Sequence, residues 1–358
     1  WLPDAMVAPT PVSVFLHSAT MVQAGIFVLL RLFPLLGDTP DWNLILCTFG
    51  AITLFIASFI SISRTDLKSM LAYSTIASLG TMVYLIGIGT AYSIFAAIVY
   101  LFAHSLYKSA LFLNTGIIEK YTGTRDIRNL SGLYITAPAL AIFSFMAALS
   151  NAGFPPFLGF ASKELFFKSG LLSDTRGVIL TILSIIGTVM LAGSSLLAGF
   201  KPFLGEYNKE KFYIKNSFLF PSGFLSIAGF AFVFFLPFLN QSLITPAATS
   251  ALGINYYFDL SLWYGFNWIL ILSLITLVGG YFAYKHFKAF YFDFSKFLKK
   301  FEPSNLYEQL SKYFKKFSYL FTKSFQSGYL SRYILYILIS SIILIGLALY
   351  GYSDFTLN

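Results

Sequence analysis

Runs of about 20 apolar residues, the length that crosses the hydrocarbon core of a bilayer, recur along this chain between short polar connections. Of its 358 residues, 57% are hydrophobic and 11% are charged, whereas a soluble domain carries about 25% charged residues. Backbone groups inside a bilayer must be hydrogen-bonded within the protein, so runs of this length fold as helices. We therefore expect an all-α, polytopic protein of the cell (inner) membrane.

The apolar runs predict nine crossings, one of them interrupted. They cover residues 11–36, 42–63, 67–90, 92–117, 134–170 (interrupted), 176–200, 218–239, 262–284 and 333–352. Most of the 24 Lys and Arg lie in alternate connections, near 64–68, 120–128, 201–215 and 285–332. The positive-inside rule places these connections in the cytoplasm.

The stretch 285–330 combines lysines with apolar residues at helical spacing, as at Phe314 and Phe317. It predicts a basic amphipathic helix on the cytoplasmic membrane face, with anionic lipid as its partner. The net charge of +9 is therefore explained without nucleic acid. We divide the chain into a transmembrane ion-translocation bundle at 1–239 and a C-terminal extension at 240–358.

Cys47 is the one cysteine of the chain. It excludes a disulfide within the chain and gives too few thiolates for an iron–sulfur or zinc site. We expect no cofactor, no metal, no redox centre and no enzymatic chemistry in this chain. Because the chain opens on Trp1 without a signal peptide pattern, we also expect it to be the inside of a longer gene product.

Ionisable side chains at bilayer depth are candidates for function because their insertion costs about 2.5–3.5 kcal/mol. His17 lies in the first run among small and polar residues. Histidine titrates near neutral pH and can pass a proton. The alternative is a neutral imidazole bonded to a neighbouring hydroxyl or carbonyl group.

The fourth run holds His104 and Lys108 one helical turn apart, with Tyr100 continuing the same face. A lysine held in a low-dielectric interior loses its proton more readily than one in water, as a proton relay requires. The alternative is that Lys108 snorkels to an interface. Its position deep in the run argues against that alternative.

The segment 151–163 contains Gly153, Pro155 and Pro156, which must interrupt a helix. Broken backbone inside a membrane persists only where it faces protein or a wet cavity, and such breaks commonly form ion sites. Lys163 and Glu164 follow the break directly. The alternative is an ordinary helix–loop–helix with both charges at the outer surface.

The ordered set of these motifs resembles the antiporter-like proton-pumping subunits of respiratory complex I and of Mrp-type sodium/proton antiporters. The motifs are Trp1–Met6, Ala8–Ser13, His17–Met21, Thr65–Lys68, Leu71–Thr75, His104–Lys108 and Gly153–Glu164. Thr122–Asp126 and Gln326–Tyr333 are most similar to the large A subunit of the Mrp antiporter.

The resemblance implies the C-terminal part of a fourteen-helix fold built from two inverted repeats with broken helices, plus extra C-terminal helices. It makes Lys108 the central relay lysine and Lys163 the lysine at the exit-side broken helix, with His17 and His104 joining them through water. Some complex I relatives carry a second histidine where this chain has Tyr100. The relay there is expected to use water or hydroxyl groups.

The resemblance implies exchange of Na⁺ and H⁺ by a multisubunit complex, with other membrane subunits as partners. One alternative is a proton-pumping subunit of a complex I-like NADH:quinone oxidoreductase or a related hydrogenase complex. The loop at Thr122–Asp126 and the basic helix followed by one span favour the antiporter. A purely structural scaffold is the third alternative, and it leaves the buried charges unexplained.

Overall fold

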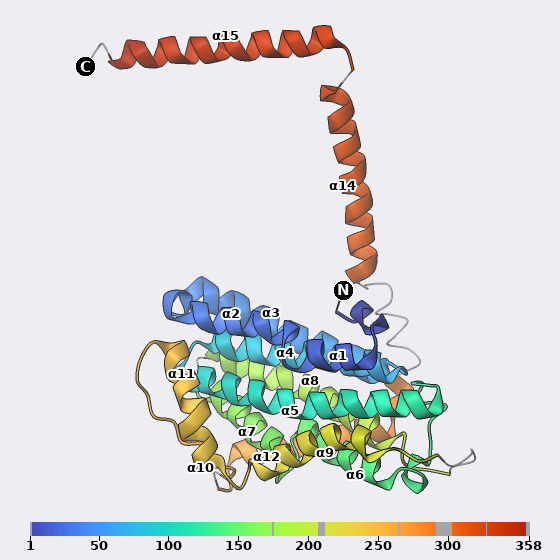
Figure 1. The fold of residues 1–358 in the computed structure, drawn as a ribbon. Helices are drawn as coiled ribbons and strands as arrows, with labels where there is room; N and C mark the ends of the chain where they lie inside the picture. The colour runs from blue at the N-terminus through green and yellow to red at the C-terminus, as the bar shows by residue number, and fades with distance from the viewer. Residues whose placement is uncertain are drawn as a thin grey trace. The chain divides into compact units, whose positions relative to one another are not determined.

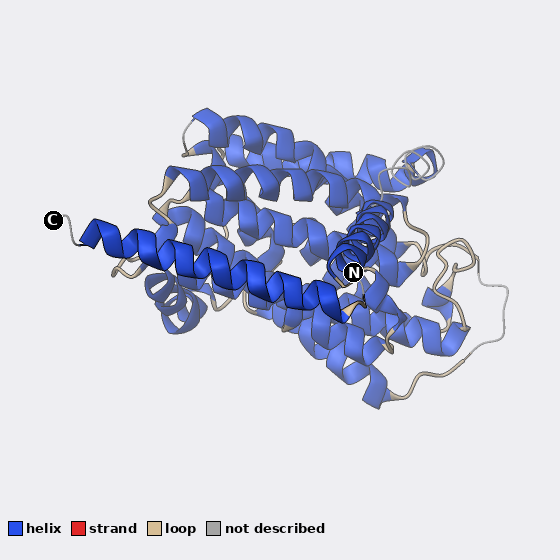
Figure 2. Cartoon of the chain, turned by 90° about the horizontal axis from the view of Figure 1, so that it is seen from above, coloured by secondary structure: helices blue, strands red, loops and turns tan. Residues whose placement is uncertain are grey.

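The structure, a computed structural model, describes residues 2–173, 175–206, 212–263, 265–290, 303–326 and 328–355. Within these ranges the regular structure is helical and no strand is present, as Figure 2 shows. The all-α prediction is therefore confirmed. Contacts divide the chain into two units, Trp1–Leu298 and Lys299–Asn358. The functional division at 239/240 stays a prediction.

Helices in the first unit follow one another along the chain, with longer connections after α5, α8 and α11 than elsewhere (Figure 1). In chain order they are η1 (Asp4–Val7), α1 (Thr10–Ser18), α2 (Met21–Leu36), α3 (Pro40–Ser63), α4 (Leu67–Ile88), α5 (Ala91–Thr122), η2 (Leu133–Ile135), α6 (Pro138–Ala152), α7 (Leu158–Leu171), α8 (Thr175–Phe200), α9 (Asn216–Ala231), α10 (Leu236–Leu239), the π-helical η3 (Asn240–Ile244), α11 (Thr245–Leu252) and α12 (Trp268–Lys285).

Seven helical spans in the described residues are long and apolar enough to cross a membrane, or up to 8 if a bent pair counts as one span. The multi-pass prediction is thus confirmed, and the predicted interruption of the run 134–170 is present as the break between the short helices α6 and α7. Two details differ. The first run is broken between α1 and α2. The run 218–239 does not stay straight, because the chain bends by 98° between α9 and the helix beginning at Leu236.

Small residues bring α3 and α4 into close contact. A Cβ atom built on Gly50 would lie 2.4 Å from the backbone nitrogen of Tyr84, and one on Gly87 would lie 2.3 Å from that of Cys47. One on Gly80 would lie 2.7 Å from the nitrogen of Leu54. Within lipid, van der Waals packing replaces the hydrophobic effect as the force between helices, and glycines permit the closest approach. These glycines therefore fix the α3–α4 pair.

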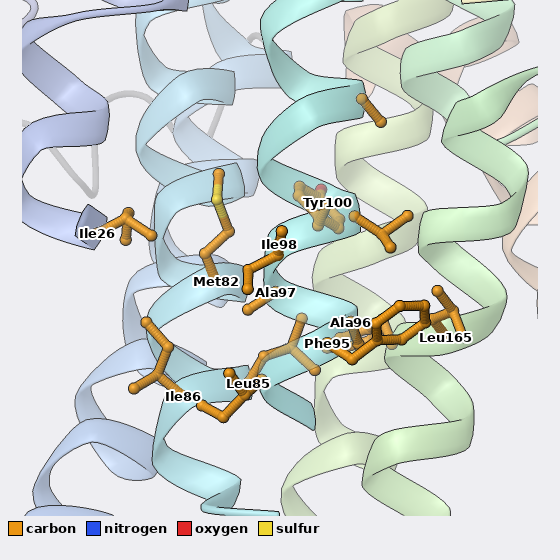
Figure 3. Close-up of a cluster of buried hydrophobic side chains, with 14 of the residues drawn as sticks. Ile26, Met82, Leu85, Ile86, Phe95, Ala96, Ala97, Ile98, Tyr100 and Leu165 are labelled. Atoms are coloured by element: carbon orange, nitrogen blue, oxygen red, sulfur yellow. The ribbon is translucent and has the colours of Figure 1, made fainter. Parts of the chain in front are cut away.

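The buried core next to this pair is drawn in Figure 3, where Met82, Leu85 and Ile86 of α4 lie beside the α5 residues from Phe95 to Tyr100. Tyr84 is fully buried, and its hydroxyl donates to the Gly177 carbonyl oxygen at 2.8 Å. On the outer side of the pair, α3 exposes large apolar side chains such as Phe49 and Ile52. That arrangement suits a helix bundle surrounded by lipid.

Three basic connections meet at one end of the bundle, which we term the basic end: residues 64–66, 123–137 and 201–206. Leu67 N donates to the Arg125 carbonyl oxygen, and Ile127 N donates to that of Thr65. Gly132 N donates to the Leu204 carbonyl oxygen across the next pair of connections. Three of the four basic connections that were predicted from charge to share one side therefore lie together in the fold, and the placement of the fourth, 285–332, stays a prediction.

The second unit contains α14 (Pro303–Phe325) and α15 (Leu330–Phe355). α14 lies within the predicted amphipathic stretch 285–330, and its apolar residues, including Phe314 and Phe317, are exposed. Residues 291–302 of that stretch, with Lys296, Lys299 and Lys300, lie outside the described residues. α15 contains the predicted final crossing, and Leu330–Leu349 is long and apolar enough to span.

Candidate functional site

The face of α5 singled out by sequence is buried in the centre of the bundle. His104 and Lys108 are 0% exposed and Tyr100 is 7% exposed. The ammonium group of Lys108 donates a short hydrogen bond to the hydroxyl oxygen of Ser74 on α4. Complete burial contradicts the alternative in which Lys108 snorkels to an interface.

The helix α1 presents a polar face to the bundle interior. All of its buried residues, Thr10, Ser13, His17 and Ser18, are polar, while Val12 and Phe15 are exposed. A helix of a soluble protein shows the reverse pattern. The His17 ring lies 5.6 Å from the ring of Phe112, which follows Lys108 by one turn on α5 as Lys108 follows His104. The fold therefore brings these three predicted residues together.

Neither histidine has the hydroxyl or carbonyl partner that the structural alternative, a hydrogen-bonded neutral imidazole, requires. Within the described part of the chain, both ring nitrogens of His17 and both of His104 are buried without a protein hydrogen-bond partner. Buried polar atoms are nearly always bonded, and ordered water supplies the partner where the protein does not. The imidazoles are thus available to water and are not consumed by structural hydrogen bonds.

Lys163 lies at the break between α6 and α7. Gly153 ends α6 with φ of 74°, and a Cβ atom on it would lie 2.5 Å from Cδ of Lys163. The Lys163 ammonium donates to the Ala152 carbonyl oxygen at 3.0 Å. Carbonyl groups at the C-terminal end of a helix are unpaired and carry partial negative charge, which favours a cation there. The lysine side chain therefore runs over the glycine and caps α6.

Glu164 follows Lys163 but does not share its surroundings. It is 2% exposed, so the alternative placing both charges at the outer surface is wrong. Adjacent helical residues point in different directions, and Lys168 lies one turn beyond Glu164 on α7. Lys168 in turn lies 4.7 Å from the centre of the Tyr92 ring. Glu164 is therefore buried on a different side of α7 from Lys163.

A small cavity of about 20 Å³ lies between α5 and the α6–α7 break. Its walls include the side chains of Tyr100 and Tyr107 on one side and those of Asn151 and Lys163 on the other. Tyr100 and Tyr107 lie two turns apart on α5, and both border the cavity. One water molecule needs about 10–15 Å³ of such space and two to four polar partners. The cavity therefore has the size and lining for a single water.

Several polar residues of the site were missed by sequence reasoning. Ser74 and Tyr107 contact Lys108 and His104 respectively, and Asn151 has its side-chain oxygen buried without a partner in the described residues. Lys68, assigned from sequence to a basic connection, is 2% exposed and forms an ion pair with Glu119. Tyr107 could have been found from sequence, because it adjoins Lys108 within the motif His104–Lys108. The burial of Lys68 has no such signal.

A family model described as NADH:quinone oxidoreductase/Mrp antiporter, TM, matches residues 1–191 of this chain. The chain is also similar to the A subunit of the Na(+)/H(+) antiporter of Bacillus subtilis (strain 168). They are 37% identical over 380 residues, which cover 97% of this chain and 47% of the relative. The protein of the same name from Alkalihalophilus pseudofirmus is 33% identical over 396 residues, covering 100% and 49%.

Among solved structures, the chain is similar to one in the Mrp complex from Dietzia sp. DQ12-45-1b. The TM-score is 0.86 at 33% identity, and the match covers 98% of this chain and 39% of that chain. The present chain thus spans about half the length of the curated relatives it matches. The resemblance to the large Mrp protein, inferred from sequence motifs, is confirmed.

Proposed function

We propose, given that this chain belongs to the NADH:quinone oxidoreductase/Mrp antiporter family, that it carries protons through the membrane part of a multisubunit Na⁺/H⁺ antiporter. The observation that carries this proposal is the enclosure of Lys108, His104 and His17 within one bundle at 0% exposure. Ionisable groups are retained at such depth only at a cost. A proton relay accounts for that cost.

In the proposed relay, Lys108 is the central site and Ser74 receives its hydrogen bond. His17 and His104 exchange protons with Lys108 through water. Their ring nitrogens, which have no protein partner in the described residues, form hydrogen bonds with that water. Each group holds a proton at a nitrogen atom and passes it to the next. No cofactor is required for such a step.

The onward step from Lys108 crosses the small cavity beside the α6–α7 break. Tyr107 and Tyr100 supply hydroxyl groups on the α5 side, and Lys163 lies on the opposite side. A hydroxyl group both donates and accepts a hydrogen bond. The tyrosine pair and one water therefore fill the role that a second histidine would have. Lys163 then controls exchange with the side opposite the basic end.

Glu164 and the second unit are not members of the relay in this proposal. Glu164, near Lys168 on α7, contributes to the local charge beyond Lys163. The exposed basic and aromatic surface of α14 lies against anionic lipid. Other membrane proteins of the complex cover the remaining apolar faces.

The proposal is tested by exchange in everted vesicles that contain the whole complex. With no NADH present, an imposed proton gradient is to be dissipated on addition of Na⁺, and the complex lacking this chain is the control. Dissipation only in the complete complex supports an antiporter. Proton movement that requires NADH and quinone would instead assign the chain to a complex I-like assembly, the other class in the family description.

A further inference from the structure

An ion-pair network outside the relay lies where α1 begins. Lys68 of α4 has its ammonium 3.2 Å from a carboxylate oxygen of Glu119 on α5. Arg125 binds the other oxygen of Glu119 at 3.3 Å and binds Asp66 at 2.9 Å. The network therefore joins α4, α5 and the connection after α5 at the basic end.

The same network holds the first turn of α1. The Thr10 hydroxyl donates to Glu119 at 2.9 Å, and the Lys68 ammonium donates to the Ala8 carbonyl oxygen at 3.2 Å. Thr10 is the first residue of α1, and Ala8 lies two residues before it. Lys68 is 2% exposed, whereas the Glu119 side chain is 36% exposed. The network thus joins the solvent-facing surface to the buried interior.

Close packing at the same place leaves no room beside this turn. A Cβ atom on Gly116 of α5 would lie 2.4 Å from the Thr10 side chain. Beyond Thr10, the buried face of α1 continues with Ser13 and His17, both 0% exposed. The buried polar face of α1 therefore leads from the basic end, at Thr10, to His17 of the relay. The packed first turn of α1 closes the end of this face that lies nearest the basic end.

We propose that Glu119, with Lys68 and Arg125, is a clamp on the first turn of α1 that closes the polar face of α1 to water from the basic end. The inference deepens the proposed function, since it assigns the access gate of the proposed relay. Glu119 acts through Thr10 and is a positioning residue. When Glu119 no longer accepts the hydrogen bond from Thr10, the first turn of α1 separates from α5 and Ser13 becomes accessible to water.

Thiol labelling tests the clamp without relying on transport. A Ser13→Cys variant is made in a Cys47→Ser background, because Cys47 is the one natural cysteine of the chain. The whole complex, in everted vesicles that expose the predicted cytoplasmic side, is treated with a membrane-impermeant thiol reagent. The rate of labelling of this chain is then compared with that in the same background carrying Glu119→Gln.

We expect Glu119→Gln to raise the labelling rate at position 13 by about fivefold or more, as a loss of about 1 kcal/mol from the closed state would produce. Arg128→Gln is the matched control, because Arg128 pairs with Asp126 at the same end of the bundle and its side chain is exposed. Its labelling rate is expected to equal that of the parent.

An unchanged rate in an assembled Glu119→Gln complex would overturn the clamp. Thr10→Val serves if that complex does not assemble, since it keeps the side-chain shape and removes only the hydrogen bond to Glu119; an unchanged rate there would likewise reject the proposal. Labelling is measured without an ion gradient. The labelling test can therefore reject the clamp whether or not the complex moves protons. A failure of proton exchange rejects the relay and leaves the labelling result unchanged.

Discussion

Lys163, a residue of α7, caps the preceding helix α6. Its ammonium group donates to the Ala152 carbonyl oxygen at 3.0 Å, across the break between the two helices. The break thus provides both the space and the partial negative charge for a buried cation. A proline-containing interruption that would weaken an ordinary helix here supplies a binding position for a lysine. The position of Lys163 depends on the absence of a side chain at Gly153.

Substitution of Gly153 tests that dependence. Gly153→Ala would put a Cβ atom 2.5 Å from Cδ of Lys163, so the lysine must leave its place over α6. We expect exchange by the assembled complex to fall by about tenfold or more, because a misplaced group in a proton path slows transfer steeply.

The control for this substitution is Gly123→Ala. Gly123 also has a positive φ, of 70°, but nothing lies within 4 Å of its added Cβ atom. Both variants carry a left-handed backbone cost of about 1–2 kcal/mol, so only Gly153→Ala displaces the lysine. Equal exchange rates in the two variants would contradict the role given to the Gly153–Lys163 contact.

The tyrosine pair at the cavity gives a second prediction. Tyr100→Phe removes a hydroxyl group from the cavity wall, and we expect exchange to slow by about 100-fold, the low end of what a positioned proton-transfer group contributes. Tyr100→His restores a group that carries protons and is expected to retain activity. Tyr121→Phe is the control, because Tyr121 stacks on Phe212 at the basic end. Full activity in Tyr100→Phe would remove Tyr100 from the relay.

Much of this site follows from the sequence because an ionisable residue within an apolar run is conspicuous. Lys108, His104 and His17 satisfy that criterion, and the fold buries all three. Lys68 does not satisfy it, since it begins a helix next to Asp66 and resembles an ordinary loop cation. Its burial arises from the approach of α1 and α5, which no local pattern encodes.

Hydropathy locates the helices but not the places where they break. The bend of 98° after α9 falls within the apolar run from Phe218 to Leu239, and the residue that signals it is Pro237 in the first turn of α10. The break between α1 and α2 has no proline within it, and the Thr20 hydroxyl donates to the Phe15 carbonyl oxygen across it at 2.8 Å. A local side-chain hydrogen bond of this kind cannot be predicted from hydropathy.

The α3–α4 interface predicts which glycines are required for stability. Gly50→Ala brings a Cβ atom within 2.4 Å of the Tyr84 backbone nitrogen, and overpacking of this kind costs about 1–3 kcal/mol. Gly25→Ala, where nothing lies within 4 Å, is expected to be neutral or to gain about 0.5–1 kcal/mol from helix propensity. Thermal unfolding in detergent measures both, and equal melting temperatures would contradict the interface.

The connection after α5 predicts a response to acid. Hydrogen bonds from Arg128 hold the pKa of Asp126 below its usual value. A depressed pKa contributes stability above the unfolded-state pKa, and this contribution is lost as pH falls through the folded-state pKa. In Asp126→Asn we therefore expect lower stability at neutral pH and a smaller loss on acidification. Parallel stability profiles of the variant and the parent would show that the pair contributes nothing.

Cation-dependent proton exchange in everted vesicles by a Lys108→Met complex tests the account most directly. Lys120→Met, at an exposed lysine near the end of the same helix, is the control, and assembly of the whole complex is verified for both. The proposed relay predicts that Lys108→Met abolishes exchange in an assembled complex, while Lys120→Met exchanges at the parental rate. Unchanged exchange in the Lys108→Met complex would contradict the relay and leave the buried lysine with a structural role.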